Sequence, residues 1–188
     1  MKTGTIVAIL VGLALLLGGC EFVQTRNGLA VGREAINAEW SQVDANLQRR
    51  SDLIPNLVET VKGYAKEETQ VFEALANARA AMAGAHTPQE KIDASNQVGG
   101  ALSRLLVVAE NYPNLKANEN FRQLQFELEG TENRILQARR RYNEAVQKYN
   151  TDLSLFPANV VGSMSGFQRE DAYFKTEPGA RTAPKVQF

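Results

Sequence analysis

The chain has 188 residues, of which 44% are hydrophobic and 22% are charged, a balance that fits a folded domain and excludes global disorder. Lys plus Arg and Asp plus Glu both number 21, so the formal net charge is zero, and the basic excess typical of proteins that bind nucleic acid is missing. The single cysteine, Cys20, excludes an intramolecular disulfide.

The first twenty residues predict attachment to a membrane. Lys2 is followed by an uncharged run to Cys20 with an apolar centre, as in a secretory signal. The run ends in Gly18-Gly19-Cys20, which is similar to the lipobox of bacterial lipoproteins, where the cysteine is lipidated and becomes the new N-terminus. Alternatively, residues 3–23 cross the bilayer uncleaved, since about 20 apolar residues span the hydrocarbon core. Cys20 is therefore a candidate lipidation site, and both forms of attachment stay open.

Helical periodicity then predicts one long helix over residues 28–83. Its seam contains, among others, Leu29, Ile36, Trp40, Val43, Leu47, Arg50, Ile54, Leu57, Val61, Leu75 and Met82. Pro55 lacks the N–H group that a helix interior needs, yet the seam keeps its register past it. This favours a kink at Pro55 over a hairpin; a true break there would raise the number of helices by one.

Two further helices follow. Thr87-Pro88-Gln89-Glu90 is a capping box with proline at the first helical position, and it opens a helix that extends to Asn111. Asn118 caps a last helix, 118–155, whose seam continues for about four heptads. That seam contains Phe121, Leu124, Leu128, Thr131, Ile135, Ala138, Tyr142, Ala145 and Tyr149.

These elements predict an all-α fold, an elongated antiparallel helical bundle of three long helices. We expect the anchor in residues 1–20, the bundle in residues 21–174 and a flexible tail in residues 175–188. After Phe156-Pro157 closes the last helix, residues 158–174 have apolar side chains without a clear period. We expect this segment to fold back over the bundle.

No catalytic, cofactor-binding or metal-binding residues stand out. His86 is the only histidine, and no H-E-x-x-H motif or cysteine pair accompanies it. Gly162-Ser163-Met164-Ser165-Gly166 has methionine where G-x-S-x-G requires the nucleophile. We therefore expect a protein that is not an enzyme, has no cofactor and binds other envelope proteins through its helical bundle. The alternatives are a structural spacer or a hydrolase whose carboxylates are distant in sequence.

Tyr142 and Tyr149 lie seven residues apart on one seam, with Asn143 and Asn150 beside them. We expect both rings to be mostly buried against the first helix, because the seam that they share is apolar. If they are exposed instead, these four residues form a candidate contact surface for a partner protein.

Four segments together resemble the LemA family of bacterial membrane-associated proteins. They are EWSQVD from Glu39, RRSDLIPNLVETVKGYA from Arg49, YPNLKANENFRQLQFELEGTENRI from Tyr112 and ARRRYNEAVQKYN before Phe156-Pro157. The resemblance covers residues 26–174. It implies a helical bundle held by its N-terminus at the bacterial cell membrane, on the extracytoplasmic side, without catalytic residues. It also implies envelope proteins, among them membrane proteases, as partners. We expect neither nucleic acid nor a small-molecule substrate as a partner.

Overall fold

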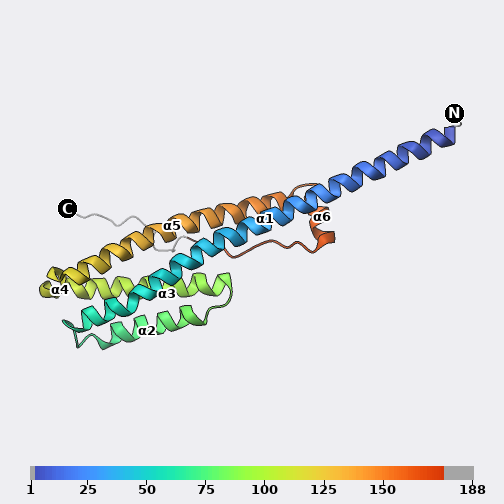
Figure 1. Ribbon diagram of the computed structural model, residues 1–188. Helices are drawn as coiled ribbons and strands as arrows, with labels where there is room; N and C mark the ends of the chain where they lie inside the picture. Colours follow the sequence, from blue (N-terminus) through green and yellow to red (C-terminus); the bar gives the residue numbers. More distant parts are fainter. Residues whose placement is uncertain (1–2, 176–188) are drawn as a thin grey trace, which may run out of the picture. The chain divides into compact units, whose positions relative to one another are not determined.

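The computed structural model describes residues 3–175, and within that range every regular element is a helix (Figure 1). The helices are α1 (Thr3–Lys62), α2 (Thr69–Gly84), α3 (Pro88–Glu110), α4 (Pro113–Ala117), α5 (Glu119–Ser154) and α6 (Ala158–Ser165). The all-α prediction is confirmed. The tail predicted for residues 175–188 lies outside the described residues, apart from Lys175.

Contacts divide the chain into two compact units. The anchor unit combines residues 3–39 of α1 with residues 141–171, which include the last part of α5 and all of α6. The bundle unit combines residues 40–140 with residues 172–175. Since α1 and α5 contribute to both units, each unit contains a pair of α1 and α5 segments.

In the bundle unit, α1, α2, α3 and α5 alternate in direction (Figure 1). Arg50 of α1 contacts Ser95 of α3 and Glu132 of α5, and α2 packs along α3. Each helix turns an apolar face inward, and burial of these faces drives the packing. The buried side chains include Val43, Leu47, Ile54, Leu57, Val61, Leu75, Val98, Leu105, Leu115, Phe121 and Ile135.

The first helix ends earlier than its seam predicted. α1 passes through Pro55 as a helix, with Ile54 and Leu57 buried, so no hairpin forms there. The chain instead breaks at residues 63–68, and the single helix predicted for residues 28–83 is wrong. The N–H groups of Tyr64 and Ala65 bond to the Val61 carbonyl at 3.0 and 2.9 Å and close the end of α1. The bundle unit consequently has four long helical segments.

The predicted caps are confirmed. The Thr87 hydroxyl accepts the Glu90 N–H at 3.2 Å, and the Glu90 carboxylate accepts the N–H groups of His86 and Thr87 at 2.8 and 3.0 Å. These backbone bonds lower the pKa of the Glu90 carboxyl. At the start of α5, the Asn118 side chain accepts the Phe121 N–H at 3.0 Å. Local capping chemistry thus fixes both helix starts.

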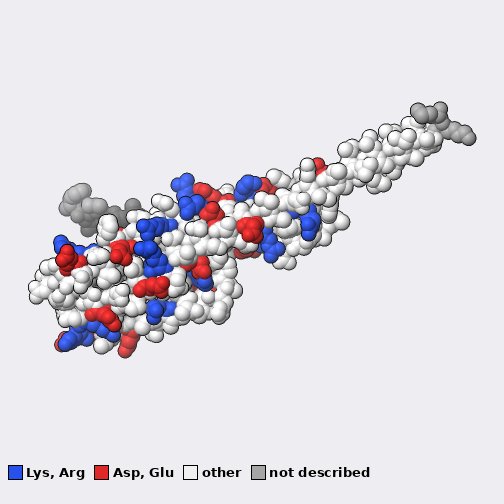
Figure 2. All heavy atoms as spheres, in the orientation of Figure 1, with Lys and Arg blue, Asp and Glu red and all other residues white. Residues whose placement is uncertain are grey.

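In the anchor unit, α5 lies antiparallel to α1. A Cβ atom at Gly32 would lie 3.2 Å from Cδ2 of Tyr149, and Arg141 donates to Glu39 at 3.2 Å. Residues 3–20 of α1 are exposed, and α1 is the one described helix long and apolar enough to cross a membrane. In Figure 2 this stretch is white on the visible face, because the first charged residue after Lys2 is Glu21.

The segment after α6 folds back along the chain, as predicted. In the anchor unit, Tyr149 donates to the Gln168 carbonyl at 2.9 Å. In the bundle unit, the Phe174 ring stacks on Trp40 with ring centroids 6.2 Å apart, and the Arg139 guanidinium lies 4.6 Å from the Phe174 centroid. Trp40 is therefore an intramolecular packing residue in this structure.

Candidate functional site: a groove between α3 and α5

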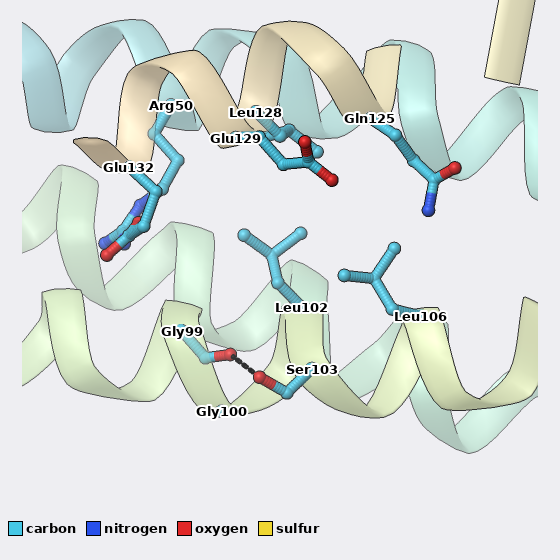
Figure 3. Close-up of a pocket in the computed structure, with 10 residues that line it drawn as sticks. All are labelled: Arg50, Gly99, Gly100, Leu102, Ser103, Leu106, Gln125, Leu128, Glu129 and Glu132. Atoms are coloured by element: carbon cyan, nitrogen blue, oxygen red, sulfur yellow. Dashed lines mark hydrogen bonds and ion pairs between the residues drawn. The ribbon is translucent and has the colours of Figure 1, made fainter. Parts of the chain in front are cut away.

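A groove of about 400 Å³ opens between α3 and α5 of the bundle unit (Figure 3). Leu102 and Leu106 point from α3 toward α5, and Leu128 meets them from the other side. Polar groups surround this apolar floor: Arg50, Ser103, Gln125, Glu129 and Glu132. An apolar floor with a few polar groups at its edge is typical of sites that bind a ligand or a peptide.

Gly99 and Gly100 form part of the groove wall on α3. A Cβ atom at either position would meet no heavy atom within 4 Å. Packing therefore does not require glycine there, although glycine in the middle of a helix costs about 0.5–1 kcal/mol relative to alanine. What the two glycines do provide is open space along the wall of the groove.

We predict that Gly100→Ala raises the free energy of unfolding by about 0.5–1 kcal/mol, because alanine is the better helix former and meets no obstacle. Urea denaturation followed by far-UV circular dichroism measures the change. Gly162→Ala in α6 is the matched control. A Cβ atom there would overlap Cδ1 of Leu153, so that side chain must shift and the gain in stability should be smaller than in Gly100→Ala. Equal shifts in the two variants would contradict the prediction.

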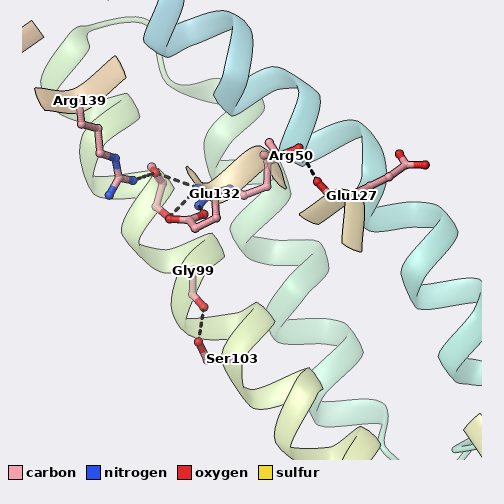
Figure 4. A network of polar contacts seen from close by, with 8 residues as sticks. Arg50, Gly99, Ser103, Glu127, Glu132 and Arg139 are labelled. Carbon is pink, nitrogen blue, oxygen red and sulfur yellow. Dashed lines mark hydrogen bonds and ion pairs between the residues drawn. The ribbon is translucent and has the colours of Figure 1, made fainter. Parts of the chain in front are cut away.

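A partly buried polar network includes two residues that line the groove, Arg50 and Glu132 (Figure 4). The Arg50 guanidinium donates to the Glu132 carboxylate at 3.0 Å, and to the carbonyl and hydroxyl oxygens of Ser95 at 3.0 and 2.8 Å. Arg139 donates to the same Ser95 hydroxyl at 2.5 Å. The network links α1, α3 and α5 of the bundle unit.

Arg50 is 2% exposed, whereas the side chain of Glu132 is 55% exposed. Burial lowers the pKa of the Arg50 guanidinium, and Glu132 opposes that shift through its charge and its hydrogen bond. The Arg50 Nε group is buried and has no hydrogen-bond partner among the described residues. The charge of Arg50 is therefore paired with Glu132, while Glu129 lies at the groove edge outside this pair.

Cys20, the predicted lipidation site, lies within α1 and is exposed. No neighbouring element covers residues 3–20 in the described part of the chain. The position is thus accessible, and lipidation itself stays a prediction.

The predicted contact strip lies in the anchor unit, where most of it is buried. Tyr142 is 1% exposed, Tyr149 and Asn150 are also buried, and Asn143 is half-buried. The Asn150 side chain exchanges two hydrogen bonds with the Glu170 backbone, at 2.7 and 3.0 Å. Burial of both rings is confirmed. A role of the four residues in partner contact stays a prediction, and it would require residues 168–170 to move.

Tyr149 also packs against α1, as expected from its seam. Burial raises the pKa of its hydroxyl, Glu170 adds to that shift and Arg33 opposes it. The hydroxyl is engaged by the Gln168 carbonyl. These contacts describe a packing residue whose polar end has a partner inside the chain.

No three His, Cys, Asp or Glu side chains among residues 3–175 are placed to hold a metal ion. His86, in the turn before α3, is exposed. The groove does bring Glu129 and Glu132 of α5 together, but Glu132 is engaged by Arg50.

The groove was not predicted from the sequence. One signal was present, because Arg50 occupies a position on the otherwise apolar seam between Leu47 and Ile54. A charged residue on a buried seam requires a partner elsewhere in the chain. The sequence could not say which carboxylate that was, since Glu132 is 82 residues away.

Fold and site together define an all-α protein with one N-terminal helix able to cross a membrane and a grooved helical bundle unit. The LemA family model matches residues 39–188. The chain belongs to the LemA family, as its sequence segments predicted.

Three magnetosome proteins are among the similar curated proteins. MamQ 1 and MamQ 2 of Paramagnetospirillum magneticum are each 26% identical over 175 residues, covering 79% of this chain and 64% of the relative. MamQ of Magnetospirillum gryphiswaldense is 24% identical over 182 residues, covering 83% of this chain and 66% of the relative. The chain thus spans just under two thirds of the length of these relatives.

Proposed function

We propose that this chain is a non-enzymatic, membrane-anchored bacterial envelope protein that binds a segment of another envelope protein in the α3–α5 groove. The observation that carries the proposal is the groove itself, with a leucine floor and carboxylates at its edge. The uncovered apolar stretch of α1 supports attachment to the membrane. Family resemblance supports an extracytoplasmic location, with membrane proteases among the partners.

The side chains that line the groove indicate what kind of segment it can bind. Leu102, Leu106 and Leu128 offer contacts to apolar side chains, and a helix presents such side chains one turn apart. Two carboxylates and one guanidinium line the groove, so its charge balance is negative. The occupant that fits is an amphipathic helix with an apolar stripe flanked by Lys or Arg.

A synthetic peptide tests this proposal with the full-length protein in nanodiscs. The probe is a fluorescein-labelled helical peptide with Leu at i and i+4 and Lys at i+3, and its matched form has Glu in place of Lys. We expect fluorescence anisotropy to show saturable binding of the Lys peptide. Binding should weaken about tenfold or more in Glu129→Lys, because that change places like charges together.

Glu73→Lys is the control, since it makes the same change in net charge on the exposed face of α2, outside the groove. Binding to that variant should match the wild type. Equal affinity of the Lys and Glu peptides, or equal loss in the two charge variants, would reject the groove as a site for a basic helix.

For the anchor, we propose that Cys20 is lipidated and that residues 1–19 are removed, because Gly18-Gly19 precede it as small residues do in a lipobox. Labelled palmitate should enter the wild-type protein, and Cys20→Ala should accumulate as a larger, unlabelled precursor. A full-length and unlabelled wild-type protein would instead identify residues 3–23 as an uncleaved spanning helix.

A further inference from the structure

The anchor unit exposes a second apolar surface near the end of the apolar stretch of α1. We call this surface the apolar corner. It consists of four exposed side chains: Leu155 (57% exposed), Phe156 (83%), Val160 (49%) and Met164 (74%). Val160 and Met164 are one turn apart on α6 and share a face. Single exposed apolar residues are ordinary, but a cluster of large ones marks an interaction surface.

The opposite side of α6 is fixed against the anchor unit. Val161 and Gly162 are buried. A Cβ atom at Gly162 would overlap Leu153 of α5 and would lie 3.4 Å from Cδ1 of Leu29 on α1. Because this close contact holds α6 on α1 and α5, its outer face is set by packing and the apolar corner is left uncovered.

The register of α1 and α5 gives the height of the corner along α1. Tyr149 of α5 lies against Gly32 of α1. The side chains of Leu153 on α5 and Leu29 on α1 both approach Gly162 of α6. Because α1 and α5 are antiparallel, each residue further toward the C-terminus of α5 lies beside a residue one position nearer the N-terminus of α1. With an equal rise per residue, Phe156 lies at the height of about residue 26 of α1. That level is about 5 Å beyond Val23, the last residue of the apolar run.

A bilayer has an interfacial region roughly 5–8 Å thick on each side of its hydrocarbon core. If residues 3–23 occupy the core, the apolar corner comes to the height of this region. Lipidation of Cys20 would place it higher, just beyond the outer edge of this region, since residue 26 lies about 9 Å along the helix from residue 20. Both forms of anchor therefore bring the corner close to the membrane surface, and the spanning form brings it to the interfacial region itself.

We propose that the apolar corner inserts into the interfacial region of the leaflet beside α1 and forms a second attachment to the bilayer. This inference rests on the proposed membrane attachment of α1. Two features favour lipid as the occupant. The corner lies about 5 Å beyond the end of the apolar stretch of α1, and residues 153–168 contain no charged side chain that would have to lose its hydration on insertion.

Tryptophan fluorescence in the full-length protein tests the proposal. Trp40→Phe removes the only tryptophan, and Phe156→Trp then places a reporter in the corner. The protein is reconstituted into nanodiscs of phosphatidylcholine and phosphatidylglycerol, with or without bromine high on the acyl chains. We expect emission at shorter wavelength than in the control Phe126→Trp, and a loss of intensity with brominated lipid.

Phe126 is the matched control, since it is an exposed phenylalanine of the bundle unit, 77% exposed. Adding Met164→Glu to the Phe156→Trp protein should remove both the shift and the quenching, because a carboxylate on the same face opposes insertion. The variant should still float with lipid through α1.

Flotation and quenching separate the two proposals. A protein that does not float with lipid would refute the membrane attachment. If the protein floats but bromine quenches the tryptophan at position 156 no more than the one at position 126, insertion of the apolar corner is refuted. The membrane attachment of α1 then still stands. A shifted emission that bromine does not quench would also refute insertion, and would mean that protein, such as a second copy, covers the corner.

Discussion

Tyr142→Ala is expected to lower the free energy of unfolding by about 3–5 kcal/mol, the cost of deleting a large buried aromatic side chain. Tyr142 is 1% exposed and is the largest fully buried side chain among residues 3–175. Alanine leaves a cavity that a close-packed helical interior cannot fully collapse around. Urea denaturation of the full-length protein in detergent, followed by far-UV circular dichroism, measures the loss.

Two further variants test whether this loss of stability comes from deletion of the buried ring. Phe126→Ala deletes an aromatic ring from the exposed face of the same helix, and it should change stability by no more than about 0.5 kcal/mol. Tyr142→Phe keeps the ring and its packing, so it should retain most of the stability that Tyr142→Ala loses. If Tyr142→Ala unfolds like the wild type, Tyr142 is accessible in solution and the four-residue strip becomes the first place to look for a partner.

Local signals in the sequence predicted the helices well. The α5 seam is buried at Phe121, Thr131, Ile135 and Tyr142, because its apolar positions repeat at a helical period over many turns. The capping box at Thr87 was predictable for a similar reason, since all its partners lie within four residues of chain. Interactions of this range need no knowledge of the tertiary fold.

The break between α1 and α2 was not predictable on the same grounds. The residues of the turn, Gly63 to Glu68, contain no proline, and the seven-residue seam continues across them from Tyr64 to Val71. Periodicity therefore favoured one helix. What decides the reversal is tertiary packing, since Ala65 is buried in the turn and Glu68 accepts the Tyr112 hydroxyl at 3.3 Å. Neither contact has a local signature.

Little of the candidate site could be predicted, because it is assembled from distant segments. Arg50 comes from α1, Leu102 from α3 and Glu132 from α5. The sequence marks Arg50 as unusual but does not give the register that places α3 and α5 beside it. The four-residue strip illustrates the reverse case. Its regular spacing correctly predicted a shared seam, yet the same spacing could not distinguish a packing face from a contact surface.

Replacing Glu132 and replacing Arg50, the two members of the ion pair in the groove, should lower the free energy of unfolding by different amounts. Glu132→Gln leaves the Arg50 charge buried without a carboxylate, which costs roughly 3–5 kcal/mol for a fully buried pair. Because Glu132 is half-exposed and water screens part of its charge, we expect a loss of about 2–3 kcal/mol. Glu129→Gln, one turn away in the same groove and outside the ion pair, should change little.

Arg50→Met should cost less, about 1 kcal/mol, because methionine fills the apolar part of the site and the exposed Glu132 carboxylate regains water. The Ser95 hydroxyl would still accept from Arg139. Adding Arg50→Met to Glu132→Gln should therefore restore part of the stability lost in Glu132→Gln alone. Urea denaturation of the two single variants and the double variant, with unchanged m values, measures this coupling. A larger loss in Arg50→Met than in Glu132→Gln would show that the bonds from Arg50 to Ser95, rather than its pairing with Glu132, hold the network together.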